Sequence, residues 1–201
     1  MDKRNAFITV ITTAAWLCLA GTALADTADI VKTCDSCHGA DNLGADSGLP
    51  TITGLSEFYH ADQLYFYRDG ERPCADAPDA SGNMTNMCAQ TADLSDDEIE
   101  AVAAHYAALP FVAAQQEFDA ALAAAGQQIH ERDCEVCHTD GGSNVEDDAG
   151  ILAGQWMGYL EATFAEYGSG EREQPEPMKK KLSALSGDDI KALLHYYASQ
   201  Q

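Results

Sequence analysis

The spacing of apolar and polar residues along this chain predicts helices. Two segments rich in tyrosine, Phe58 to Tyr67 and Trp156 to Tyr167, place apolar side chains at helical spacing. Ser95 and Ser186 are each followed three residues later by a carboxylate, a pattern that is typical of a capped helix N-terminus. An amphipathic segment follows each of these serines. The pattern therefore favours an all-α fold.

The first 25 residues have the features of a secretory signal. Two basic residues precede a mostly apolar stretch from Ala6 to Ala20, and Ala23-Leu24-Ala25 forms a cleavage pattern of small residues. No later segment is apolar enough to cross a bilayer. We expect cleavage after Ala25 and a periplasmic mature chain without a transmembrane span. An uncleaved N-terminal anchor is the alternative.

One five-residue motif occurs twice, as Cys34-Asp35-Ser36-Cys37-His38 and as Cys134-Glu135-Val136-Cys137-His138, at an offset of 100 positions. With the same offset, Gly70-Glu71-Arg72 matches Gly170-Glu171-Arg172 without a gap. Self-similarity of this kind indicates a duplicated unit. We therefore predict two tandem domains after the signal peptide of residues 1–25.

The domain boundaries follow from the helical pattern. The first domain is expected over residues 26–110, where Pro110 ends a helical segment, and the second over residues 114–201. Each should begin with a helix before its cysteine motif. This helix is expected to be short in the first domain, Ala28 to Thr33, and long in the second, Ala113 to Arg132.

The repeated motif predicts covalently attached haem. A C-x-x-C pair alone is also found in redox dithiols and in zinc sites, but paired zinc motifs usually lie roughly 15 to 20 residues apart. A histidine directly after the second cysteine is the attachment pattern of haem c. We predict two haem c groups, one bonded to Cys34 and Cys37 and the other to Cys134 and Cys137. His38 and His138 would be the proximal iron ligands.

The position of the methionines suggests the opposite iron ligands. Met87 and Met178 each lie seven residues before the leucine that opens the matching capped segments. Histidine and methionine ligation suits electron transfer. Met84 does not lie seven residues before such a leucine, so it is not expected to be a ligand. Met157 lies in a helical segment, where core packing is expected. Ligation by a second histidine is the alternative, and the candidates are His60, His105, His130 and His195, none of which has a counterpart in the other half.

The carbonyl of Pro50 could orient the ring of His38, and Gly150 stands at the matching position of the second domain. The segment between the G-E-R turn and the methionine is nine residues longer in the first domain. Cys74 lies at one end of this segment, and Cys88 directly follows Met87. In an oxidising compartment these two cysteines favour a disulfide. Free thiols, a metal site and a bond to a partner are the alternatives.

The charge of the chain excludes one class of partner. The 201 residues carry a net charge of −22, and removal of Asp2, Lys3 and Arg4 with the signal leaves −23. Nucleic acid is not an expected partner, because phosphate binding needs clustered basic residues. The acidity fits either basic redox partners or a salty environment. Three consecutive lysines, Lys179 to Lys181, stand out beside Met178 as a local docking patch or a solvated loop.

The two C-x-x-C-H motifs and G-x-R turns resemble those of the dihaem class I cytochromes c, which carry electrons in the bacterial periplasm. The second domain also resembles the cytochrome subunit of flavocytochrome c sulfide dehydrogenase. The segments that carry this resemblance are Phe118-Asp119-x-Ala121-Leu122, Cys134-Glu135-x-Cys137-His138, Gly141-Gly142, Ile151-Leu152-Ala153-Gly154-Gln155-Trp156 and Tyr197-Ala198-Ser199-Gln200-Gln201. It implies an FAD-containing flavoprotein partner.

Three functions are consistent with these motifs. The chain could be the electron-accepting subunit of a sulfide dehydrogenase, not an enzyme by itself, since no flavin-binding glycine motif follows a strand pattern. It could instead be a free dihaem carrier that exchanges electrons with redox proteins between respiratory or photosynthetic complexes and a terminal oxidase. A haem peroxidase would need an open iron position, which the two methionine ligands argue against.

Overall fold

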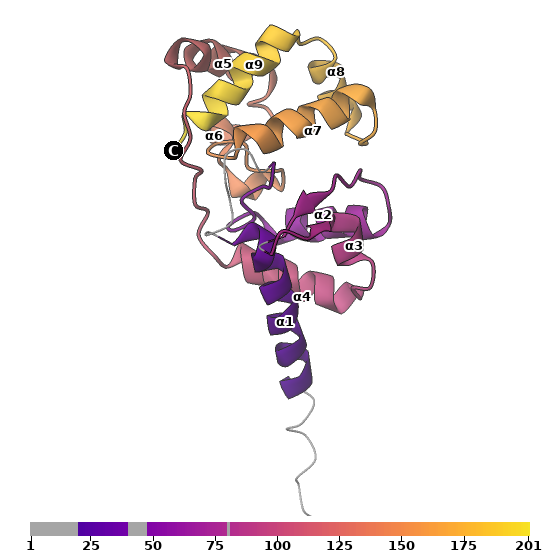
Figure 1. The fold of residues 1–201 in the computed structure, drawn as a ribbon. Helices are drawn as coiled ribbons and strands as arrows, with labels where there is room; N and C mark the ends of the chain where they lie inside the picture. The colour runs from indigo at the N-terminus through magenta and orange to yellow at the C-terminus, as the bar shows by residue number, and fades with distance from the viewer. Residues whose placement is uncertain (1–19, 40–47, 80) are drawn as a thin grey trace, which may run out of the picture.

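The structure is a computed structural model that describes residues 20–39, 48–79 and 81–201. Its helices form two lobes that are joined along one side by an extended segment (Figure 1). Residues 1–19 of the predicted signal peptide lie outside the described residues. Within the described part of the chain, no helix is both long and apolar enough to cross a membrane.

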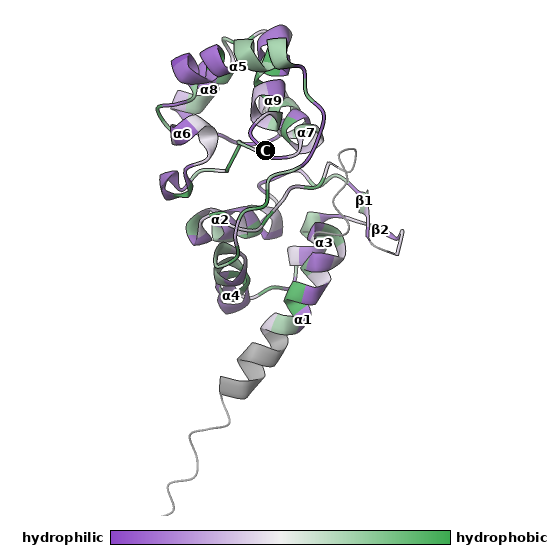
Figure 2. Ribbon diagram, turned by 90° about the vertical axis from the view of Figure 1, so that its left-hand side faces the viewer, coloured by the Kyte–Doolittle hydropathy of each residue, from purple (hydrophilic) through white to green (hydrophobic). Residues whose placement is uncertain are grey.

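The described residues of the first lobe form four helices and one hairpin. The helices are α1 (Ala20–His38), α2 (Glu57–Arg68), α3 (Met87–Thr91) and α4 (Asp96–Ala107), and the strands are β1 (Ala77–Pro78) and β2 (Met84–Thr85). The two strands pair antiparallel, with Ala77 opposite Thr85. This hairpin lies beside α3 (Figure 2) and is the exception to an otherwise helical lobe.

The second lobe is helical throughout its described elements. They are α5 (Ala120–Asp133), α6 (Thr139–Gly142), the 3₁₀ turn η1 (Val145–Asp147), α7 (Met157–Ser169), α8 (Glu176–Leu182) and α9 (Gly187–Ala198). The all-α prediction is thus confirmed, apart from the short hairpin of the first lobe.

The helix caps lie where the sequence predicts them. The hydroxyl of Ser95 accepts a hydrogen bond from the amide of Glu98, and the carboxylate of Glu98 accepts one in return from the Ser95 backbone. Ser186 and Asp189 form the same reciprocal pair at the start of α9. Each box satisfies amide groups that have no partner inside the helix, so α4 and α9 begin at defined residues.

Two predicted helix boundaries are wrong. The helix before the first motif is not confined to Ala28 to Thr33, because α1 continues through the motif to His38. The helix before the second motif begins at Ala120 instead of Ala113, because the carboxylate of Asp119 caps it by accepting from two following amides. The preceding residues are extended against the second lobe, where the amide of Ala114 donates to the carbonyl of Gly154 at 2.7 Å.

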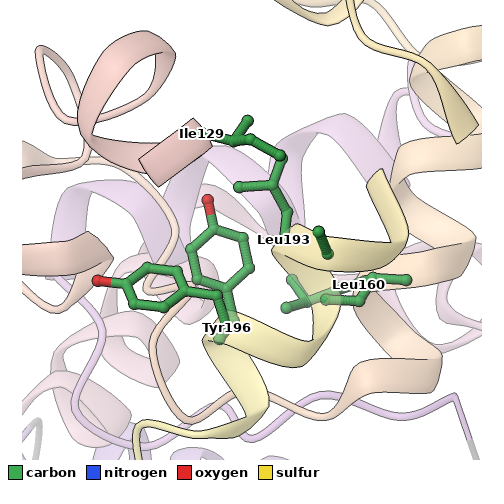
Figure 3. Packing of buried hydrophobic residues seen from close by; sticks show 7 residues of the cluster. Ile129, Leu160, Leu193 and Tyr196 are labelled. Atoms are coloured by element: carbon green, nitrogen blue, oxygen red, sulfur yellow. The ribbon is translucent and has the colours of Figure 1, made fainter. Parts of the chain in front are cut away.

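The core of the second lobe lies where α5 and α9 cross. Ile129 from α5, Leu160 from α7, and Leu193 and Tyr196 from α9 point toward one another (Figure 3). Close approach of the two backbones is permitted by Gly126, since a Cβ at this position would meet the carbonyl of Ala192. The lobe therefore depends on a tight helix crossing as well as on apolar burial.

Candidate functional site

The residues predicted for the first haem line one cavity. Its volume is about 290 Å³, and Cys34, Cys37, His38 and Met87 are all among its lining residues. The cysteine motif occupies the C-terminal end of α1, and Met87 opens α3. The fold thus brings together two parts of the sequence that are about fifty positions apart.

His38 is oriented by the backbone. Its Nδ1 lies 3.1 Å from the carbonyl oxygen of Pro50, the residue that the sequence suggested for this role. The side chain is buried, and burial lowers the pKa of His38. A neutral imidazole whose Nδ1 donates to a carbonyl leaves Nε2 available to an iron.

The cysteines of the first motif do not suit a redox dithiol. Cys34 is half-buried, and burial raises the pKa of its thiol to about 11. Because the thiolate is the reactive form, this thiol is a poor nucleophile at neutral pH. No group of three or more histidine, cysteine or acidic side chains that could hold a metal ion occurs within the described residues. These two observations disfavour the zinc and dithiol interpretations.

The second motif is held by similar local contacts. Cys134 ends α5, and the amide of His138 donates to the carbonyl of Cys134 at 3.0 Å. Burial lowers the pKa of His138, and the backbone of Gly150 opposes this shift, so Gly150 stands where the first lobe has Pro50. Met178 lies half-buried in α8. The residues of the second set come from three segments of one lobe, the end of α5 with the motif, the loop at Gly150, and α8.

Two buried tyrosines mark equivalent points of the two lobes. The hydroxyl of Tyr106 donates to a carboxylate oxygen of Asp35, inside the first motif, at 2.8 Å. The hydroxyl of Tyr197 lies 3.0 Å from Nδ1 of His130, whose Nε2 faces Glu135 of the second motif at 2.7 Å. In both lobes the last helix therefore braces the cysteine motif.

The four other histidines have different surroundings. His130 is fully buried with three polar partners, so it is a packing histidine. His195 accepts from the amide of Asp119 at 3.0 Å, and His105 is exposed. His60 lines the first cavity, and burial lowers its pKa to about 4.

The remaining methionines lie away from ligand positions. Met84 belongs to the exposed hairpin, with 64% of its surface accessible. Met157 opens α7 and packs against the core cluster of the second lobe, in agreement with the predicted core role. Of the neighbouring lysines, Lys181 pairs with Asp133 at 3.0 Å and Lys179 lies 3.7 Å from Glu176.

A buried polar network joins the lobes, and sequence reasoning did not find it. Arg72 and Arg172 are both buried and both donate to the side-chain oxygen of Gln63, at 2.9 and 2.7 Å. Both guanidinium groups also lie within 4 Å of the same carboxylate oxygen of Glu166, at 3.8 and 3.6 Å. The repeated G-E-R turn was the available signal, but its arginines could not be assigned to the interface from spacing alone.

The network leaves donors that suit a haem. Nε of Arg72 and an amino group of Arg172 are buried and make no hydrogen bond, although both face the Glu166 carboxylate oxygen, which makes none either, and Arg72 lines the first cavity. Two guanidinium groups face one carboxylate, so positive charge is in excess there. Buried donors of this kind are normally satisfied by an anionic partner. The propionate carboxylates of a haem have the required charge, and the residues present therefore fit the group.

Cys74 and Cys88 are joined by a disulfide, with Cα atoms 5.8 Å apart. Cys74 lies just before the hairpin, and Cys88 is the second residue of α3. Both cysteines are half-buried, and Cys74 also lines the first cavity. The remaining described cysteines are those of the two haem motifs.

Comparison with known proteins agrees with this arrangement. The family model for cytochrome c matches residues 20–109. A thiosulfate dehydrogenase electron acceptor of Stutzerimonas stutzeri is 32% identical over 178 residues, which cover 83% of this chain and 78% of that protein. A second such protein, from Thiomonas intermedia, is 31% identical over 149 residues. The aligned region covers 69% of this chain and 64% of that protein.

Solved structures give the same picture. Reduced cytochrome c4 from Pseudomonas stutzeri superposes with a TM-score of 0.70 and 26% identity, covering 89% of this chain and 98% of that one. The thiosulfate dehydrogenase TsdBA from Marichromatium purpuratum superposes with a TM-score of 0.67 and 30% identity. The match covers 90% of this chain and 40% of that longer one. The expected resemblance to a sulfide dehydrogenase subunit is not supported by these matches, which point to thiosulfate instead.

Proposed function

Because this chain belongs to the dihaem cytochromes c of the cytochrome c4 type, we propose that it is a periplasmic acceptor of electrons from a thiosulfate dehydrogenase. The observation that carries this proposal is the match over 83% of the chain to a protein named as such an acceptor. The electron-carrier role itself is common to both kinds of relative, and the chain is not an enzyme by itself.

We assign the haem sites as follows. Cys34 and Cys37 would bond the first haem, and His38 and Met87 would ligate its iron, since all four line one cavity. Cys134, Cys137, His138 and Met178 would form the corresponding set for the second haem. Haem iron supplies one-electron oxidation and reduction, and ligation by histidine and methionine favours a high reduction potential. The residues of the chain would hold these ligands in the wall of the first cavity.

Two sites in one chain suit the chemistry of thiosulfate. Oxidative coupling of two thiosulfate ions releases two electrons, and a carrier with two haem sites can accept both. Residues of both lobes line the first cavity, since Glu166 of α7 is among them beside Gln63 and Arg72 of the first lobe.

The decisive experiment is reduction of the purified dihaem protein by thiosulfate. The oxidised protein is mixed anaerobically with thiosulfate and a catalytic amount of thiosulfate dehydrogenase, and haem absorbance is followed. We expect both haems to become reduced with the enzyme and neither without it. A parallel reaction uses sulfide and the flavoprotein subunit of a flavocytochrome c.

The two reactions separate the candidate donors. Reduction only in the sulfide reaction would restore the sulfide dehydrogenase hypothesis from the sequence and overturn the present one. Failure of both enzymes, with normal reduction by a chemical reductant, would identify a free carrier between other complexes. The net charge of −22 further predicts that the enzymatic rate changes with ionic strength, and that it falls if the docking face of the enzyme is basic.

A further inference from the structure

The two lobes position their methionines by different means. In the second lobe, six positions separate the buried Arg172 from Met178, and Pro175 and Pro177 lie among them. Proline fixes the φ angle, so this connection is short and stiff. In the first lobe the equivalent connection, from Arg72 to Met87, takes 15 positions and includes the β1–β2 hairpin. A longer connection restrains its far end less, unless something shortens it.

The disulfide provides that shortening. Cys74 is two residues after Arg72, and Cys88 directly follows Met87. Arg72 is a firm anchor, because it is 5% exposed and donates to Gln63 and to the hydroxyl of Tyr159. The covalent path from this anchor to Met87 therefore avoids the hairpin altogether.

The local contacts around Met87 are consistent with this path. Helix α3 has five residues, and a helix of this length is marginal without external support. Asn86 supports it by accepting from the amide of Ala89 at 2.9 Å, and its own amide donates to Asp76 at 2.8 Å. The backbone amide of Cys88 lies 3.0 Å from the sulfur of Cys74. Both sides of Met87 are thus fixed to the segment that contains the disulfide.

We propose that the Cys74–Cys88 disulfide is a positioning device that holds Met87 at the first haem, so that the sixth ligand of this haem, unlike that of the second, depends on a disulfide. The inference rests on the proposed haem sites. Met87, Cys74 and Arg72 all line the cavity that contains Cys34, Cys37 and His38, so the disulfide lies in the wall of the site. A disulfide that only stabilised the fold would not need this location.

The test is the double variant Cys74→Ser, Cys88→Ser of the dihaem protein. Two properties are measured at a temperature where the variant is folded: the sulfur-to-iron charge-transfer absorption of the oxidised protein and carbon monoxide binding by the reduced protein. We expect the absorption to fall to about half, because one of two methionine ligands is lost, and one carbon monoxide to bind per chain. The unaltered second lobe is the internal reference.

Two single variants calibrate these readouts. Met87→Ala should reproduce the spectral change by removing the ligand directly, while Met84→Leu, in the exposed hairpin, should leave the spectrum unchanged. If the double variant does not fold, the disulfide of the wild-type protein is reduced with a dithiol, the two thiols are alkylated, and the haems are reoxidised before the same measurements.

The outcomes are distinct. Full charge-transfer absorption and no carbon monoxide binding in a disulfide-free protein would overturn the proposal, even if its melting temperature had fallen. An unchanged spectrum for Met87→Ala would also overturn it, by removing Met87 from the ligand set. Neither result would bear on the thiosulfate reaction, which is measured separately.

Discussion

Gly126 is the residue on which the crossing of α5 and α9 depends. Its missing side chain leaves room for the backbone carbonyl of Ala192 and for the β-carbon of Tyr196. Both partners belong to a helix whose inner face is buried, and neither is the flexible end of a side chain. The close approach brings Leu193 and Tyr197, which are fully buried, against the helix that ends at the second cysteine motif.

We therefore expect Gly126→Ala to destabilise the protein. An added methyl group forces the two backbones apart, and overpacking of this kind typically costs about 1–3 kcal/mol. The free energy of unfolding is measured by denaturant titration. The matched control is Gly168→Ala in α7, where an added Cβ meets nothing within 4 Å. Equal effects for both variants would contradict the role of Gly126.

Single residues were also the level at which the sequence was most informative. The C-x-x-C-H motif assigns its cysteines and histidine by chemistry alone, without any knowledge of packing. Pro50 could be suggested as the partner of His38 because the role requires only a nearby carbonyl. His130 shows the limit, since its burial and its contacts with Tyr197 and Glu135 depend on a crossing that no local pattern encodes.

Helix α9, like α4, has a local determinant of its first residue. The hydroxyl of Ser186 accepts from the amide of Asp189 at 3.2 Å, and the carboxylate of Asp189 accepts from the Ser186 amide at 2.9 Å. Helix α9 supplies much of the core of the second lobe, including Leu193 and Tyr196 (Figure 3). The start of this helix therefore affects the whole lobe.

Ser186→Ala should lower the free energy of unfolding by about 1 kcal/mol, the usual loss for an N-cap serine. The hydroxyl of Ser186 also donates to the Asp189 carboxylate and lowers its pKa, so this part of the contribution is present above the pKa of an unfolded aspartate and is lost as the pH falls through the folded value. Unfolding is measured at neutral and acidic pH. The control is Ser183→Ala at the C-terminal end of α8, which should show no such pH dependence.

The prediction of helices from sequence succeeded where the signal is local. The caps at Ser95 and Ser186 and the tyrosine-rich helices α2 and α7 follow from residues that are neighbours in sequence. It failed at the start of α5, because residues before Asp119 pair with the second lobe instead of extending the helix. The hairpin was missed because its strands have only two residues each.

At the scale of the molecule, Gln155 connects the lobes. Its side chain is buried in the second lobe, accepts from the amide of Thr51 at 2.8 Å and donates to the carbonyl of the same residue at 3.0 Å. The side-chain amide of Gln155 thus pairs with both the N–H and the C=O of Thr51, as a backbone amide of a neighbouring strand would. Sequence analysis predicted the duplication but not this contact. A constant offset of 100 positions between the repeats does not show how the two copies pack against each other.

Gln155→Leu should weaken the association of the lobes. The variant leaves both polar groups of the Thr51 backbone without partners, which costs about 1–3 kcal/mol for each buried group. Thermal unfolding is followed by haem absorbance and by far-ultraviolet circular dichroism. We expect a lower midpoint than in the control Gln127→Leu, which removes only an exposed contact with Glu131. An identical midpoint for the two variants would argue against a role for Gln155 between the lobes.

The shared network of the two arginines has a consequence for the ancestry of the chain. A duplicated unit descends from a single copy that could have formed an isologous dimer. Glu166 stands at the position of Phe66 in the other repeat. A dimer of two first halves would now bury two guanidinium groups without this carboxylate, and a dimer of two second halves would bring two carboxylates together. Gln63 likewise matches Thr163 in the other repeat, so two of the four residues of the network exist in one half only, and neither half could form the same network with a copy of itself.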